Sequence, residues 1–305
     1  TWFASGLEKR CEVLRSWGAA IERNTPAILE ALSIDTGRRF MAQVEITNTL
    51  ERIAFWTERT PQIMAGIKQG TSKLVPSVKY RYHLVPYPVV GVISPWNVPL
   101  ILSVIDAIPA LLAGCSILLK PSEVTPRFVA AFQASIDEVP ELAAVLGIVM
   151  GGAQTGEFVV DNSDLVCFTG SVSTGRKVAA RAAQNFIPAF LELGGKDPAV
   201  ILPSADLDNA STAVLRSAAG INGQACQSLE RIYVHESVVE EFVELLIIKA
   251  QRIEISWPDI NQGHVGPFIF QQQALKRKIF TRYLTVKKAL AVGKVIILFQ
   301  SRQNM

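Results

Sequence analysis

The chain has 305 residues, of which 49% are hydrophobic, and a formal net charge of +3. This length exceeds the usual range of a single domain, so we expect two packed units with a sizeable apolar core. Because the net charge is small and no run of Lys and Arg exceeds three residues, the charge pattern of a nucleic-acid-binding protein is absent. The composition predicts small-molecule partners.

No metal site is visible in the sequence, because the cysteines lack C-x-x-C spacing and the histidines are scattered. These residues are Cys11, Cys115, Cys167, Cys226, His83, His235 and His264. The first ten residues lack the basic start and apolar run of a secretory signal. We therefore expect a cytoplasmic protein with reduced thiols.

The first predicted elements are helices. Apolar residues recur at spacings of three and four over residues 7–21, which predicts an amphipathic helix that ends near Asn24. Residues 26–32 are predicted to form a second, short helix, and residues 40–56 a third. The N-terminal region is therefore expected to be helical.

Strand patterns follow. Residues 75–85 alternate like an edge strand or hairpin arm, and Pro86 and Pro88 punctuate this pattern. Short apolar runs then alternate with helical stretches, which predicts βαβ units and a mostly parallel sheet. The expected strands are 89–94, 116–119, 144–150, 165–168, 199–202 and 231–235, and a helix is expected over 238–250.

Residues 98–119 are long and apolar enough to resemble a membrane helix. Pro99 and Pro109 interrupt this stretch, and Gly114 follows. We therefore favour a short helix followed by a buried strand, with no membrane partner.

Ligands of a parallel sheet bind at the carboxyl ends of its strands, so the loops there are candidate sites. The loop Ser94–Pro99 holds the polar amide of Asn97 between two prolines, although an ordinary turn would also explain it. Lys120 and Glu123 follow the next strand and could bind the hydroxyl groups of an adenosine ribose, or form a solvated surface pair.

The segment 168–175 follows a strand and opens a helix, so its backbone and Ser171 could bind a phosphate or simply cap the helix. Arg176 stands where a P-loop has lysine, and G-x-G-x-x-G is absent, which disfavours ATP chemistry.

A last group of residues suits covalent catalysis. Gly194 and Gly195 leave the backbone next to Glu192 free to reposition, and Cys226 lies in a polar turn that contains a glycine. A mobile carboxylate and an accessible thiol can act as base and nucleophile. The other three cysteines lie in apolar stretches and are predicted to be buried and inert.

Five motifs, P-W-N-x-P, K-P-S-E, F-T-G-S, L-E-L-G-G-K and G-Q-x-C, occur here in this order. Together they resemble the NAD(P)-dependent aldehyde dehydrogenase superfamily, and the resemblance extends from the first helix to Gly266-Pro267. It assigns Cys226, Glu192, Asn97 and Lys120 to catalysis. Cys226 would attack an aldehyde, the Asn97 amide and the Cys226 backbone N–H would bind the oxyanion, and Glu192 would activate water to release a carboxylic acid.

The resemblance also implies NAD as cofactor, because the Glu123 carboxylate would repel the 2′-phosphate of NADP. The family contains exceptions, so NADP is kept as the alternative cofactor. The matching cofactor positions are Ile93, Ser94, Trp96, Lys120, Glu123, Gly152, Gly156, Ser171, Leu193 and Gly194.

The implied fold is α/β and aldehyde-dehydrogenase-like. It combines a Rossmann-type parallel-sheet cofactor domain, residues 1–75 and 87–193, with an incomplete α/β catalytic domain, residues 194–305. Residues 76–86 would be the oligomerisation strand, which implies a homo-oligomer in full-length family members.

The chain also departs from the family. The later E-x-F-G-P motif is missing, and after Gly266-Pro267 the expected helix and strand give way to Gln271–Gln273 and a tail that resembles a frameshifted or mis-spliced end. We therefore expect a C-terminally truncated or aberrant member, with unpartnered apolar faces on the 75–85 arm and the strand at 232–234. The alternative function is an inactive paralogue that binds nucleotide or a full-length partner. A CoA-acylating enzyme is disfavoured because Glu192 is retained.

Overall fold

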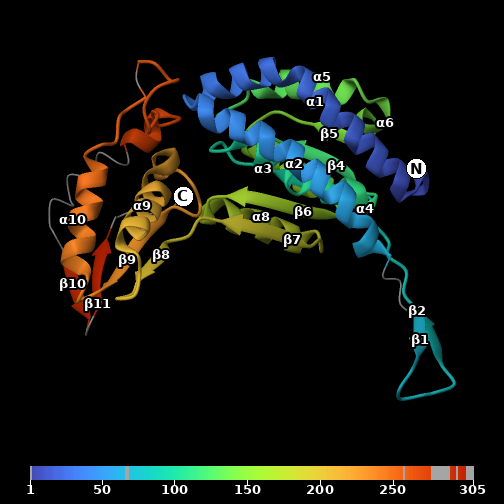
Figure 1. Ribbon diagram of the computed structural model, residues 1–305. Coiled ribbons are helices and arrows are strands. Elements are labelled where there is room, and N and C mark those ends of the chain that lie inside the picture. Colours follow the sequence, from blue (N-terminus) through green and yellow to red (C-terminus); the bar gives the residue numbers. More distant parts are fainter. Residues whose placement is uncertain (1, 66–68, 257, 276–288, 293–294, 300–305) are drawn as a thin grey trace. The chain divides into compact units, whose positions relative to one another are not determined.

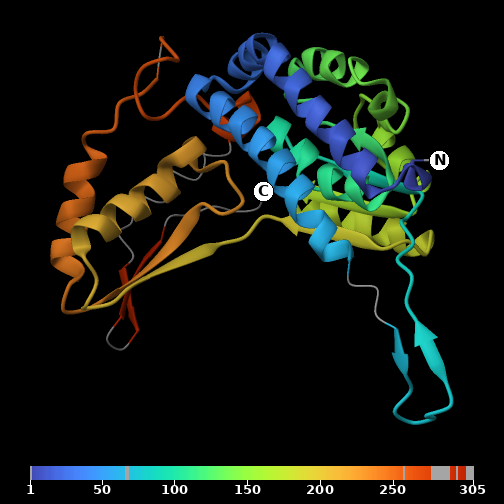
Figure 2. The ribbon, with the colours of Figure 1, turned by 45° about the vertical axis from the view of Figure 1, so that its right-hand side comes forward.

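The computed structural model describes residues 2–65, 69–256, 258–275, 289–292 and 295–299. The chain divides into two units. Unit 1 comprises Thr1–Ala31, Ala42–Thr169 and Arg176–Leu191, and unit 2 comprises Leu32–Met41, Gly170–Gly175 and Glu192–Met305. Figures 1 and 2 show the ribbon in two orientations.

Two long helices begin the chain after a 3₁₀ turn at Phe3–Ser5: α1 (Leu7–Thr36) and α2 (Arg39–Met64). The prediction that the first helix ends near Asn24 was wrong, because α1 continues through Pro26. Proline removes one backbone donor and clashes with the preceding turn. Ile28 and Leu32 beyond it are fully buried, so packing of the apolar stripe on both sides outweighs the local preference.

The sheet of unit 1 has the strand order β5-β4-β3-β6-β7, and β3 pairs in parallel with both β4 and β6. Its strands are β3 (Val89–Ile93), β4 (Ser116–Lys120), β5 (Leu146–Ile148), β6 (Leu165–Gly170) and β7 (Ala189–Leu193). The predicted parallel sheet is confirmed. Strand β7 was not predicted, because it lies at the sheet edge with Phe190 and Glu192 exposed, and Glu192 interrupts the kind of apolar run from which the other strands were predicted.

Helices connect these strands and cover the sheet (Figure 1). They are α3 (Pro99–Val104), α4 (Ala107–Ala113), α5 (Phe128–Asp137), α6 (Pro140–Ala143), α7 (Ala153–Asp161) and α8 (Val172–Gln184). Because such crossovers are right-handed, the reversal of strand order after β5 places α7 and α8 on the face opposite α4 and α5. Gly91 lets α7 pack closely on β3, since a Cβ there would lie 2.8 Å from Val159 Cγ1.

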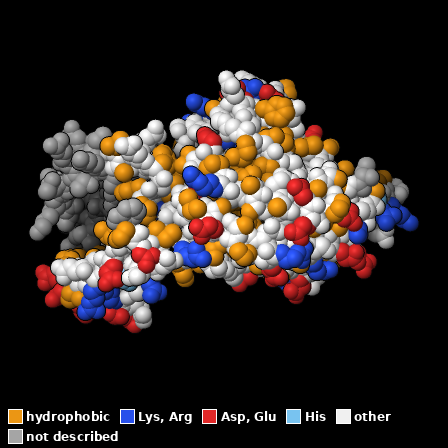
Figure 3. Space-filling view, turned by 90° about the horizontal axis from the view of Figure 1, so that it is seen from above, with side chains coloured by type: hydrophobic (Ala, Val, Ile, Leu, Met, Phe, Trp, Pro, Cys, Tyr) orange, Lys and Arg blue, Asp and Glu red, His pale blue; other side chains and the backbone are white. Residues whose placement is uncertain are grey.

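The apolar stretch 98–119 folds as α3, α4 and β4 and is not one continuous helix. None of the described helices is long and apolar enough to cross a membrane. On the face drawn in Figure 3, basic and acidic side chains are interspersed with apolar ones and do not gather by sign.

A two-stranded hairpin stands apart from the rest of unit 1 in both ribbon views (Figures 1 and 2). Its strands β1 (Gln69–Thr71) and β2 (Lys79–Arg81) pair antiparallel. The predicted strand over 75–85 is therefore much shorter than expected, because a turn closed by a hydrogen bond from Val78 N to Val75 O occupies its first part. Apolar side chains are exposed here, as predicted: Val78 is 50% and Val85 81% exposed, and Leu74 next to this segment is 95% exposed.

Unit 2 contains a sheet of order β10-β11-β9-β8, with β8 (Asp197–Ile201) parallel to β9 (Leu229–His235). On the other side of β9 lies β11 (Val295–Phe299), antiparallel to β9 and to β10 (Ala289–Val292). The prediction that the 232–234 strand lacks partners was wrong, because β9 pairs on both edges and Val234 is fully buried. The predicted loss of structure after Pro267 is also incomplete, since residues 271–275 are helical and two strands follow.

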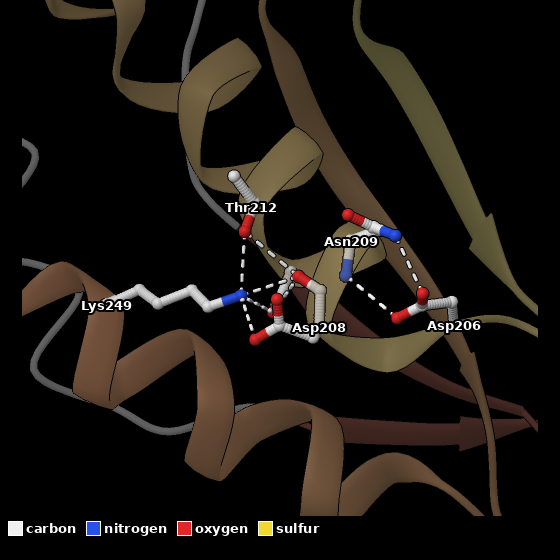
Figure 4. Close-up of polar contacts among 6 residues, drawn as sticks. Asp206, Asp208, Asn209, Thr212 and Lys249 are labelled. Atoms are coloured by element: carbon white, nitrogen blue, oxygen red, sulfur yellow. Dashed lines mark hydrogen bonds and ion pairs between the residues drawn. The ribbon is translucent and has the colours of Figure 1, made fainter.

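Helices α9 (Leu207–Ala219) and α10 (Val239–Ala250) pack with this sheet around the fully buried Phe242. A partly buried polar cluster joins them (Figure 4). Lys249 on α10 donates to Thr212 Oγ1 at 2.7 Å and to Ser211 Oγ at 3.0 Å, and pairs with Asp208 Oδ1 at 2.7 Å. The Lys249 ammonium thus supplies hydrogen-bond donors to the oxygen atoms that the N-terminal part of α9 presents to α10.

We expect Lys249→Met to loosen α9 from α10 while keeping the apolar stem. Because the Lys249 side chain is only 20% exposed and Ser211 is fully buried, the loss should cost about 1–3 kcal/mol of unfolding free energy, measured by urea denaturation. Arg252→Met, at an exposed residue just after α10, is the matched control and should cost under ~0.5 kcal/mol. Equal losses in both variants would show that the cluster contributes nothing specific.

Candidate active site

The loop that follows β3 carries Asn97 and is braced along its length. Ser94 Oγ lies 2.7 Å from Ser103 Oγ, and Thr125 Oγ1 donates to Trp96 O at 3.2 Å. Asn97 itself is buried, and Pro99 begins α3 directly after the loop. The turn predicted from the two prolines is therefore a fixed support for one amide side chain.

A buried carboxylate completes this support. Glu45 on α2 is 2% exposed, and its Oε2 accepts from the backbone N–H of Leu100 at 2.8 Å and of Ile101 at 3.3 Å. Negative charge is favourable at a helix N-terminus, so Glu45 holds the first turn of α3 and hence the end of the Asn97 loop. Sequence reasoning missed Glu45, because a single Glu within an amphipathic helix is normally a surface residue.

The end of β4 carries Lys120 and Glu123. Lys120 Nζ lies 2.9 Å from Glu123 Oε2, with the Lys120 side chain 6% and that of Glu123 56% exposed. Partial burial alone would raise the pKa of the Glu123 carboxyl, but hydrogen bonds from Lys120 and from the Glu123 backbone, together with the charge of Lys120, outweigh burial, so the pKa is lowered. Glu123 is therefore an ionised acceptor at neutral pH that adjoins a buried cation.

Several predicted cofactor positions meet at this edge of unit 1. Ile93 and Lys120 are register partners, Ser94 N donates to Lys120 O at 3.1 Å, and a Cβ on Gly156 would lie 3.9 Å from Lys120 Cδ. Gly152, before α7, faces open space. Donors and an acceptor at the carboxyl ends of parallel strands fit the ribose and phosphate groups of a dinucleotide.

Ser171 caps helix α8. Its Oγ accepts from Thr174 N at 3.2 Å and also lies 3.0 Å from the hydroxyls of Ser173 and Thr174. The sequence left two interpretations of this segment open, a phosphate site and a helix cap. In the structure the Ser171 side chain forms the cap.

The four cysteines separate by burial, as predicted. Cys226 is exposed, and Cys11, Cys115 and Cys167 are buried. Burial raises the pKa of all three buried thiols, that of Cys167 to about 12, with the charge of Asp106 as a smaller cause there. At neutral pH the buried thiols are therefore protonated and inert.

Glu192 and its glycines belong to the same unit as Cys226. The Glu192 side chain is exposed at the end of β7. At Gly195 a Cβ would lie 2.4 Å from Asp197 Oδ1 and 3.8 Å from Cys226 O, so the loop after Glu192 lies against the backbone of Cys226. Similarly, a Cβ on Gly175 would lie 2.5 Å from Leu193 Cδ2. A side chain at Gly195 or Gly175 would displace the side chain of Asp197 or Leu193.

A second pair of charges ties this loop to β9. Lys196 forms an ion pair with the buried carboxylate of Glu230, and Arg231 donates to Lys196 O at 3.0 and 2.7 Å. The register between β8 and β9 skips Glu230, so this residue occupies a bulge. Sequence reasoning missed this pair, since no pattern links two charged residues so far apart in the chain.

Of the predicted catalytic residues, Asn97 and Lys120 belong to unit 1, and Glu192 and Cys226 to unit 2. The described residues contain no group of His, Cys, Asp and Glu suited to a metal ion. Unit 2 thus holds an exposed thiol and a carboxylate beside a glycine-rich loop, and unit 1 holds a strand edge with the donors that a dinucleotide requires.

Comparison with known proteins gives concordant results. Residues 1–293 match the model of the aldehyde dehydrogenase family. The chain is 38% identical over 239 residues to 4,4′-diapolycopene aldehyde oxidase of Methylomonas sp., covering 76% of this chain and 44% of that protein. The chain spans about half the length of the curated relatives it matches.

Solved structures are similar as well. PutA of Anabaena variabilis, assigned to the aldehyde dehydrogenases, is 48% identical with a TM-score of 0.86, covering 90% of this chain and 58% of that one. A point mutant of betaine aldehyde dehydrogenase of Staphylococcus aureus, solved in complex with NAD⁺, is 26% identical with a TM-score of 0.84, covering 92% of this chain and 57% of that one. Family model, sequence identity and fold agree, and the chain belongs to the aldehyde dehydrogenase family.

Proposed function

We propose that this chain carries the cofactor-binding region and the nucleophile of an enzyme that oxidises an aldehyde to a carboxylic acid with NAD(P)⁺. The observation that carries the proposal is the geometry around Cys226. Its thiol is exposed while the other three are buried, and the loop that follows Glu192 lies against its backbone. A nucleophile and a candidate base thus belong to one unit of the fold.

In this proposal the Cys226 thiolate attacks the aldehyde carbon and forms a C–S bond, which leaves a tetrahedral oxyanion. The Asn97 amide and the Cys226 backbone N–H donate to that oxyanion, a contribution of roughly 3–4 kcal/mol per donor. When bound, NAD(P)⁺ would supply the acceptor for a hydride from the aldehyde-derived carbon. Loss of that hydride leaves a thioester on Cys226. Glu192 then takes a proton from water, which attacks the thioester, releases the acid and restores the thiol.

Lys120 and Glu123 would hold the cofactor at the adenosine ribose. The buried Lys120 ammonium would donate to the ribose hydroxyls, and the ionised Glu123 carboxylate would accept from them. Because Glu123 would repel a 2′-phosphate, the site favours NAD over NADP. The open space at Gly152, before the first turn of α7, supports binding of a phosphate of the cofactor there.

The same proposal includes self-association. The β1–β2 hairpin exposes apolar side chains without contacts that bury them, Leu74 and Val85 among them. Exposed apolar arms of this kind are covered by a partner chain, and a second copy of the protein would supply a matching strand edge. An inactive chain that only binds nucleotide or a partner is the alternative.

We expect iodoacetamide to label Cys226 selectively near neutral pH. It is exposed, whereas burial keeps the thiols of Cys11, Cys115 and Cys167 protonated, because a raised pKa favours the protonated form at every pH below it. Peptide mapping by mass spectrometry gives the rates, and labelling in urea, where all four should react, is the control. Faster labelling of Cys115 or Cys167 would contradict the assignment of the nucleophile.

We expect Glu192→Gln, in a protein of family length, to form about one NADH per site at the normal rate and then turn over roughly 100-fold or more slowly. Removal of the base stalls thioester hydrolysis and leaves hydride transfer intact. Stopped-flow absorbance separates the two phases. Glu236→Gln, at another exposed glutamate of unit 2, should change neither phase. A burst that falls together with the steady-state rate would assign Glu192 a different role.

A further inference from the structure

Two consecutive residues before Cys226 have left-handed backbone conformations. Ile221 has φ 54° and ψ 29°, and Asn222 has φ 55° and ψ 31°. Asparagine tolerates this region, but isoleucine does not, because its branched Cβ is crowded there. Such strain persists only where the surroundings impose it, and it is concentrated at functional sites.

The carbonyl oxygen of Ile221 accepts three hydrogen bonds. Gln224 N donates at 2.9 Å, Gln224 Nε2 at 3.0 Å and Arg38 Nη2 at 3.1 Å. The first two are local to the turn. The third comes from the segment between α1 and α2, and Arg38 is buried at 7% exposure. A buried guanidinium makes a charge-assisted bond, which is stronger than a bond between neutral groups.

Three segments that are far apart in the sequence meet at this turn. Asn222 Nδ2 donates to Gly266 O, and a Cβ on Gly266 would lie 3.1 Å from Arg38 Cγ. Residue Gly37, with φ +65°, is so close to Pro267 that a Cβ there would lie 2.5 Å from its Cγ. The Arg38 stem is therefore clamped while its guanidinium reaches the strained carbonyl.

We propose that Arg38 is a positioning residue for the nucleophile. Its guanidinium holds the left-handed turn at Ile221, and this turn fixes the backbone that presents Cys226. Arg38 acts through the backbone and contacts none of the reacting atoms. The chemical role of Cys226 rests on the proposed function, but the hold on the turn does not.

A purely structural role for Arg38 predicts something different. If Arg38 only fills space or stabilises the unit, its loss cannot be repaired at Ile221. If it holds a strained residue, then Ile221→Asn, which adopts the left-handed conformation more easily, should repair the loss. The double variant therefore separates the two roles.

The test is hydrogen exchange, measured by mass spectrometry on the peptide 219–228. Arg38→Met keeps the apolar stem and removes the donor, and we expect exchange there to rise about tenfold or more, as the loss of one hydrogen bond from a charged donor implies. Arg38→Lys retains a charged donor and should show a smaller rise. In Arg38→Met/Ile221→Asn, exchange should return to within about twofold of the parent chain. If Arg38→Met does not fold, Arg38→Lys with and without Ile221→Asn makes the same comparison.

The control is Asp206→Ala, which removes the cap that accepts from Asn209 N at the start of α9. It should raise exchange in the peptide 206–218, and Ile221→Asn should not repair it. Unchanged exchange in Arg38→Met, or a rise that Ile221→Asn leaves unrepaired, would overturn the proposal.

A second measurement links the turn to chemistry. In a protein of family length, Arg38→Met should slow the first-turnover burst of NADH about tenfold, with NADH affinity unchanged, and Ile221→Asn should restore it. If the parent protein showed no burst of NADH, the proposed function would be contradicted. The hydrogen-exchange results would still decide the role of Arg38.

Discussion

An exposed thiol is useful as a nucleophile only when the backbone that carries it is fixed, and in this chain the Ile221 carbonyl is where that backbone is fixed. Three donors meet at one oxygen, and one of them is a buried guanidinium from a distant segment. The turn cannot relax without losing these bonds, so the strain at Ile221 is compensated by contacts outside the turn. Exposure of Cys226 and rigidity of its support are thereby combined.

The same principle recurs in other parts of the fold. In unit 1 the buried carboxylate of Glu45 holds the first turn of α3 behind Asn97, and in unit 2 the Lys196–Glu230 ion pair ties the loop after Glu192 to β9. Each buried charge supports a loop that bears one of the proposed functional groups. Burial of a charge is costly unless it is paired, so these contacts require a defined geometry.

Much of this organisation could be predicted from the sequence, because it depends on local patterns. Apolar runs spaced by helices predicted the parallel sheet, and the apolar neighbours of the three other cysteines predicted their burial. Long-range packing could not be predicted. It carries α1 through Pro26, and it pairs β9 with β11. Period and propensity describe one segment at a time and contain no information on such partners.

The supporting residues were missed for the same reason. Arg38 and Glu45 lie in segments that resemble ordinary surface helix ends and faces, and their roles depend on backbone groups far along the chain. The motif residues could be predicted because the chemistry of a thiol, a carboxylate and an amide is recognisable in isolation. Their supports could not, because a hydrogen bond to a backbone carbonyl or N–H group does not depend on the side chain of the residue that supplies that group.

The central claim, covalent catalysis at Cys226, is tested most directly by trapping the acyl intermediate. A protein of family length is mixed with NAD⁺ and a short-chain aldehyde, quenched in acid within one turnover, digested and analysed by mass spectrometry. The account predicts an acyl thioester on the peptide that contains Cys226, formed only with NAD⁺ present and absent from Cys226→Ser. Sustained NADH formation by Cys226→Ser, or an acyl group on another residue, would contradict it.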